Sequence, residues 1–197
     1  LLDRASILLD RQVKFRLRGK QKAIVGSKLA LIRLLDRQPR MALDALNESV
    51  SPGLDSGLAL ERKRLRSRGV FELGDSESAL KLIKNDNSRK ADLLRADIYW
   101  RTQDWQRSAL IYKRLIGETG KDGRRLSDLS ATLVVNWVVS LSMNGQKDKL
   151  NEARQIYAAM MDSTRYREAF RLITNKTAED LQDFRTLTER FQEIGRF

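Results

Sequence analysis

Residues 91–115 read ADLLRADIYWRTQDWQRSALIYKRL, and this stretch decides the fold. Two segments with helical spacing of apolar residues flank a short polar break at residues 102–104. Small residues lie twelve positions apart at Ala96 and Ser108, and the bulky Tyr112 follows four positions after the second. Antiparallel helices joined by a tight turn approach closely only where both present small side chains. The stretch therefore predicts a helix hairpin closed at Ala96 and Ser108.

The same spacing recurs along the chain. Ala30 and Ala42 lie twelve apart, as do Ser67 and Ala79, and a bulky residue again follows four positions after the second member of each pair. A fourth unit ends with Ala153 and, four positions later, Tyr157. One hairpin cannot bury its apolar face alone, so neighbouring hairpins stack into a solenoid. The spacing predicts units at about 22–50, 54–85, 88–117 and 126–161.

Helical spacing of apolar residues covers almost the whole chain, and only 2 prolines and 11 glycines interrupt it. The expected helices span residues 2–17, 22–36, 39–49, 54–73, 76–84, 88–102, 105–117, 126–144, 149–161, 165–174 and 178–195. Residues 165–197 carry no small-residue pair, and their last helix has one apolar face, made of Leu181, Phe184, Leu187 and Phe191. This pattern predicts a cap at the end of the array.

The unit at 91–115 resembles the tetratricopeptide repeat family. It has the small Ala96, the aromatic Tyr99 three positions later, Asp104 at the turn with Trp105 after it, and then the small Ser108. The resemblance covers about residues 22–161. It implies a single all-α domain, a right-handed α-α solenoid of about five tetratricopeptide-like helix hairpins with a C-terminal capping helix at 165–197.

The chain also departs from the family pattern. The tryptophan near the start of each repeat and the proline that closes it are missing. The family repeats about every 34 residues. In this chain the second small residue of successive units lies at Ala42, Ala79, Ser108 and Ala153, at spacings of 37, 29 and 45 positions. The whole resembles the C-terminal part of large bacterial repeat proteins. Together with a first residue that is not methionine, this resemblance predicts a fragment of a longer protein.

The composition argues against most catalytic sites. The chain has no cysteine and no histidine, which excludes disulfides, the usual zinc, haem and iron–sulfur sites, thiol nucleophiles and Ser-His-Asp triads. The acids Glu179, Asp180 and Asp183 are expected at a helix start or on a solvent face. Residues 117–123 lack the preceding strand and the Lys-Ser/Thr ending of a phosphate-binding loop. We expect no catalytic residue, no cofactor, no metal site and no enzymatic activity.

The charge is strongly basic and uneven. The net charge is +12, and residues 1–70 hold 16 Lys and Arg against 7 Asp and Glu. This skew indicates either an acidic partner for the first part or a solubilising surface. The run at residues 62–68, RKRLRSR, and the ten basic residues within 11–40 could contact phosphates. An RNA-binding helical repeat is therefore the alternative, although Phe15 and Phe71 are the only aromatics there for base stacking.

The resemblance also implies a binding site. In the resembled family, ligands lie along the groove lined by the first helix of each hairpin, which implies a non-catalytic scaffold that binds a protein or peptide. Carried over to this sequence, the groove positions are Arg64, Arg68, Phe71, Leu93, Asp97, Trp100 and Arg101. Trp100 beside Arg101 has the composition of an interaction hot spot, although a core position between hairpins is the other reading of Trp100. No apolar stretch is long enough to cross a membrane.

Overall fold

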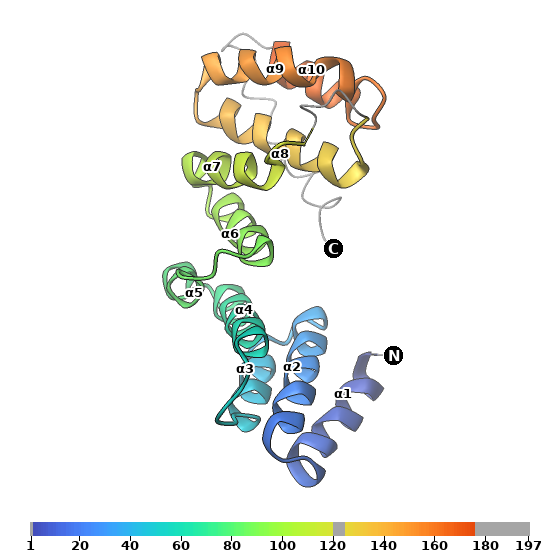
Figure 1. The fold of residues 1–197 in the computed structure, drawn as a ribbon, viewed down its shortest axis with the longest axis vertical. Coiled ribbons are helices and arrows are strands. Elements are labelled where there is room, and N and C mark those ends of the chain that lie inside the picture. The colour runs from blue at the N-terminus through green and yellow to red at the C-terminus, as the bar shows by residue number, and fades with distance from the viewer. Residues whose placement is uncertain (1, 120–124, 176–197) are drawn as a thin grey trace. The chain divides into compact units, whose positions relative to one another are not determined.

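The computed structural model describes residues 2–119 and 125–175 (Figure 1). Within these ranges the protein is all-helical and contains no strand, which confirms the all-α part of the predicted fold class. The helices are α1 (Leu2–Arg11), the π-helix η1 (Gln12–Arg16), α2 (Gly19–Leu35), α3 (Pro39–Glu48), α4 (Ser56–Glu72), α5 (Ser76–Leu82), α6 (Arg89–Arg101), α7 (Trp105–Ile116), α8 (Asp128–Met143), α9 (Lys147–Met161) and α10 (Arg167–Asn175). The expected helix at 178–195, with the capping residues and the candidate acids named above, lies outside the described residues.

Four helix pairs close through one and the same turn. Three residues lie between the end of each of α2, α4, α6 and α8 and the start of the next helix. The middle residue of each turn has a positive φ angle: 56° at Arg37, 97° at Gly74, 58° at Gln103 and 67° at Gly145. The following N–H groups donate back to the carbonyls five positions earlier, at Arg33, Val70, Tyr99 and Leu141. These are Schellman motifs, which satisfy the last carbonyl groups of a helix while reversing the chain.

The last residue of each turn also starts the following helix. Asp75 accepts a hydrogen bond from the Ser78 amide at 2.9 Å, and Asp104 accepts one from the Arg107 amide at 3.1 Å. The equivalent residues Gln38 and Gln146 form no such side-chain cap. Pro39 lies in the first turn of α3, where its missing N–H costs no hydrogen bond. A short turn thus serves as the end of one helix and the cap of the next.

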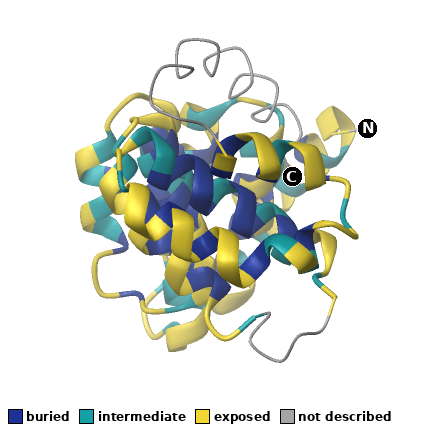
Figure 2. Cartoon of the chain, turned by 90° about the horizontal axis from the view of Figure 1, so that it is seen from above, coloured by how far each residue is buried: buried dark blue, intermediate teal, exposed yellow. Residues whose placement is uncertain are grey.

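Residues 1–98 form one compact unit, in which α2, α3, α4 and α5 pack against one another in sequence order. Ala30 and Ala42 are both fully buried in one core cluster with Val13, Leu29 and Leu46. Figure 2 shows the division of the helices into buried and exposed sides.

Two close contacts inside this unit require small residues. The Ser67 hydroxyl donates to the Ala79 carbonyl at 2.8 Å, so this predicted pair does meet across its hairpin. A Cβ atom on Gly26 would lie 1.9 Å from the Ser49 Oγ, so any larger residue would force α2 away from the end of α3.

Residues 99–197 form the second compact unit, built around α8. This helix packs against α7, α9 and α10, and it is buried on most of its circumference. Its Ser140 shares a hydrogen bond of 2.9 Å with Ser108 of α7, so a pair of small polar residues brings these helices together. Trp137 packs edge-to-face on Tyr157 of α9, with ring centroids 6.1 Å apart. Trp137 is therefore a core residue.

At the middle position of the repeated turn, we expect the introduction of a glycine to stabilise the protein and the removal of a glycine to destabilise it. Gln103 adopts a left-handed conformation that glycine adopts without steric cost, so we expect Gln103→Gly to raise the free energy of unfolding by about 0.5–1 kcal/mol. Gly74→Ala should lower it by about 1 kcal/mol, because alanine is strained at a φ of 97°. Urea unfolding of both variants measures this. A destabilised Gln103→Gly variant would show that its side chain has a role beyond the turn.

Candidate functional site

Three of the expected groove residues lie on one exposed face of the first unit. Arg68 of α4 forms an ion pair with Asp97 of α6 at 2.8 Å and a second with Glu72 of its own helix at 2.9 Å. The side chain of Arg68 is 42% exposed and that of Asp97 35%, so the network lies at the surface. Leu93 lies one turn before Asp97 on α6 and is 43% exposed. We call Arg68, Glu72, Leu93 and Asp97 the α4–α6 face.

Arg64 lies one turn before Arg68 but is engaged in the fold. Its guanidinium is 2.6 Å from the Asp86 carboxylate, and the two side chains are only 15% and 4% exposed. Burial by itself would raise the pKa of Asp86, but hydrogen bonds from Ser88 and Arg64 outweigh it and hold the pKa below its usual value. Arg64 therefore fixes the segment between α5 and α6 to α4 and supports the α4–α6 face from one side.

The remaining expected groove residues lie elsewhere. Phe71 is 6% exposed and belongs to a core cluster with Ala79, Ile83 and Ile98. Trp100 is 7% exposed and packs edge-to-face on Trp105 and Tyr112, at centroid distances of 5.3 and 6.0 Å.

Neither aromatic ring therefore presents a surface to a partner, and the structure agrees with the core alternative for Trp100. Arg101 is exposed at the last residue of α6, in the second unit.

The arginine side chains of the basic run at residues 62–68 bind other residues of the protein. Arg66 donates to the Asn47 side chain at 2.7 Å, while Arg64 and Arg68 pair with the carboxylates described above. Arg62 points to main-chain acceptors, and Lys63 is the exposed cation of the run. The run wraps around α4, as seven successive helical residues must. It therefore does not form one continuous phosphate-binding patch on α4.

The Arg62 side chain donates several hydrogen bonds to the preceding hairpin. One guanidinium nitrogen donates to the Ala23 carbonyl at 2.8 Å and the Ser27 hydroxyl at 3.2 Å. The other donates to the Leu46 carbonyl at 2.6 Å and the Ser49 hydroxyl at 3.1 Å. Burial, with a contribution from nearby Arg66, lowers the pKa of Arg62 from its usual value. This side chain ties α4 to both helices of the preceding hairpin.

Arg95 repeats this use of arginine in the next hairpin. It donates to the carbonyls of Ile83 and, at 3.3 Å, Lys84, and its other nitrogen is 2.7 Å from the Asp92 carboxylate. In both cases a guanidinium caps carbonyl groups at the C-terminal end of the preceding helix, α3 or α5. Sequence reasoning missed both contacts, because nothing distinguishes these arginines from the exposed ones beside them.

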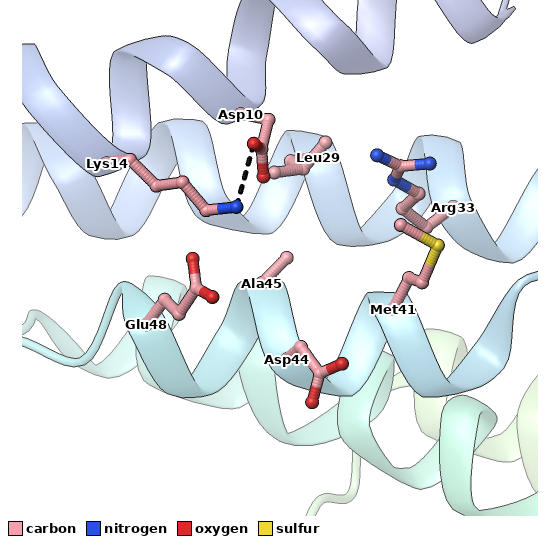
Figure 3. A pocket seen from close by; sticks show the side chains of 8 residues that line it. All are labelled: Asp10, Lys14, Leu29, Arg33, Met41, Asp44, Ala45 and Glu48. Carbon is pink, nitrogen blue, oxygen red and sulfur yellow. Dashed lines mark ion pairs between the residues drawn. The ribbon is translucent and has the colours of Figure 1, made fainter.

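A shallow pocket lies between α1, η1, α2 and α3 (Figure 3). Leu29 and Ala45 are its buried apolar residues, and Met41 is partly exposed beside them. The charged residues that line it are Asp10, Lys14, Arg33, Asp44 and Glu48. Lys14 forms an ion pair with Asp10 at 3.0 Å, and this pair, helped by Glu48, raises the pKa of Lys14. Mixed charges around an apolar base could contact a polypeptide side chain.

In the part of the chain that the structure describes, no helix has the length and apolar character needed to cross a membrane. Across residues 2–119 and 125–175, no group of three acidic side chains is arranged to hold a metal ion. Comparison of the chain with protein-family profiles, curated proteins and solved structures finds no match. The class of the protein is thus defined by its own geometry as all-α, with packed helix hairpins.

Replacing Arg62 tests its structural role. We expect Arg62→Met to lower the free energy of unfolding by about 2–4 kcal/mol, because two main-chain carbonyls and two hydroxyls lose their donor. Lys63→Met, on the exposed side of the same helix, is the matched control and should change stability by less than about 0.5 kcal/mol. Equal effects of the two substitutions in urea unfolding would contradict this role.

The buried ion pair between Arg64 and Asp86 predicts a loss of stability in Arg64→Met that depends on pH. We expect Arg64→Met to cost about 2–3 kcal/mol at pH 7, because Asp86 keeps its charge but loses its main partner. The lowered pKa of Asp86 stabilises the folded wild type above pH 3.8, and this gain is lost as the pH falls through the folded-state pKa. The difference between wild type and Arg64→Met should therefore narrow below about pH 4. A difference that stays constant from pH 7 to pH 3 would rule out the ion pair as its origin.

Proposed function

We propose that the chain is a non-catalytic, tetratricopeptide-like interaction module that binds a partner protein on the α4–α6 face. The observation that carries this proposal is the exposed Leu93 beside a fixed set of charges from two helices. An apolar anchor surrounded by oriented polar groups is the usual composition of a protein-binding surface. The partner would place an apolar side chain on Leu93 and complementary polar groups along Arg68 and Asp97.

A right-handed solenoid of such hairpins is part of the same proposal. The four identical turns support it, because they set the same chain reversal between the helices of each pair. The hydrogen bond between Ser67 and Ala79 and the shared burial of Ala30 and Ala42 support it as well. In such an array the first helices of neighbouring hairpins lie side by side, and the Arg68–Asp97 pair links two of them.

The rigidity of the α4–α6 face favours a binding role. Arg68 is held by two carboxylates, and Arg64, one turn away, is held by a nearly buried one. Side chains that are already ordered lose little conformational entropy when a partner binds. Two arginines of the 62–68 run, Arg62 and Arg64, are engaged in the fold, which leaves fewer cations of this run to the RNA-binding alternative.

Photo-crosslinking in cells tests the proposal. We replace Leu93 with a photoreactive phenylalanine in the full chain, and as a matched control we do the same at Leu110 of α7, which is 61% exposed. We expect a discrete protein adduct from position 93 and none from position 110. The adduct should weaken severalfold in Asp97→Lys, which places two cations together on the face. An adduct to RNA, or equal protein adducts from both positions, would contradict the proposal.

A further inference from the structure

The outer side of the first helix carries an unusual pattern of exposed residues. Arg4, Leu8, Arg11 and Phe15 follow one another at intervals of four, three and four positions. Each interval is close to one turn of an α-helix, and the last one is also close to one turn of the wider π-helix η1. The four side chains therefore form one row along α1 and η1. We call this row the α1 stripe.

The α1 stripe faces away from the core of its unit. Ser6 and Val13, on the opposite side, are 1% and 0% exposed, and Leu9 packs against the cluster that contains Val13. In contrast, Leu8 is 63% and Phe15 83% exposed, and Ile7 at the flank is 53% exposed. Three large apolar side chains in water on one short helix exceed the scattered single exposure that is ordinary at a surface.

The cations of the stripe are available for binding. Asp10 pairs with Lys14 at the side of the helix, whereas Arg4 and Arg11 form no ion pair with any described residue. The stripe thus alternates a guanidinium with an apolar side chain over about 16 Å of helix. Its charge is uncompensated along that whole length.

This alternation distinguishes between two kinds of occupant. A helix that lies on an anionic membrane keeps its apolar residues in one band and its cations at the borders. Here the cations stand in the middle of the apolar row, where insertion would bury Arg4 and Arg11 among acyl chains. A partner helix has no such conflict, because its own side chains can alternate in the complementary order.

We infer that the α1 stripe docks an acidic amphipathic helix of a partner protein. The partner presents two apolar residues seven positions apart, which contact Leu8 and Phe15. It presents a carboxylate before the first of them and another midway between them, which pair with Arg4 and Arg11. This surface is separate from the α4–α6 face, and the inference holds whether or not that face binds a partner.

A designed peptide tests the inference directly. The probe is a fluorescent alanine-based helix with two leucines seven positions apart and glutamates in the two complementary positions, added to the full chain. We expect a Kd on the order of 10 μM in low salt, measured by fluorescence anisotropy. Phe15→Ala should weaken binding about tenfold or more. The control Leu110→Ala removes another large exposed apolar residue, from α7, and should leave the Kd unchanged.

A charge exchange makes the test specific. Arg11→Glu should weaken binding about tenfold, and a peptide with lysine in place of the midway glutamate should restore it. The control Arg40→Glu changes an exposed cation on α3 and should not respond to the exchange. The inference is overturned if the peptide does not bind, or if Arg11→Glu and Arg40→Glu weaken it equally. Binding to phosphatidylserine vesicles but not to the peptide would overturn it too, as would a dimer in sedimentation that Phe15→Ala abolishes.

Discussion

A helix that ends against a packed neighbour leaves its last carbonyl groups without intrahelical partners, and this constraint recurs throughout the described part of the chain. Burying such carbonyls without hydrogen bonds costs free energy. In four places the same three-residue turn supplies hydrogen bonds to these carbonyls. The turns are those at Arg37, Gly74, Gln103 and Gly145. Because that turn reverses the chain in one defined way, it also determines where the small residues of the two helices meet.

At the other ends of the hairpins the connections are longer, and arginine takes over the same task. Arg62 and Arg95 reach from the following helix to the carbonyls that end α3 and α5. A guanidinium suits this task, because its several donors lie in one plane and its long stem packs along the helices. Part of the strong positive charge of the first seventy residues is therefore a requirement of folding, and its presence there is no evidence of a nucleic-acid partner.

The charges of the α4–α6 face and those of the α1 stripe are in two different settings. On the α4–α6 face they are paired with one another, which orients them around Leu93. On the α1 stripe they are uncompensated and alternate with exposed apolar residues. Paired charges give geometric specificity, whereas uncompensated charges favour association with a partner of opposite sign. The two surfaces of this unit thus differ in how their charges are compensated.

The sequence by itself determined the helices and the pairing of α2 with α3 and of α4 with α5. Apolar periodicity located every described helix to within a few residues, and the twelve-residue spacing of Ser67 and Ala79 identified residues that do meet. Such features are local, because they depend on helix geometry and on the length of one turn. A glycine marks the turn in the sequence at Gly74 and Gly145, whereas Arg37 and Gln103 hold the same conformation without a glycine to mark it.

Only the tertiary structure decided which side chains are available. The family pattern placed Phe71 and Trp100 in a groove, whereas packing against Ile83 and Tyr112 buries them. It also separated Arg62, which is bonded to main-chain carbonyls, from Lys63 beside it, which faces solvent. Adjacent residues of one type look alike in a sequence. The surroundings of such residues differ, because they are formed by helices that are distant in the chain. These surroundings are set only when the helices pack.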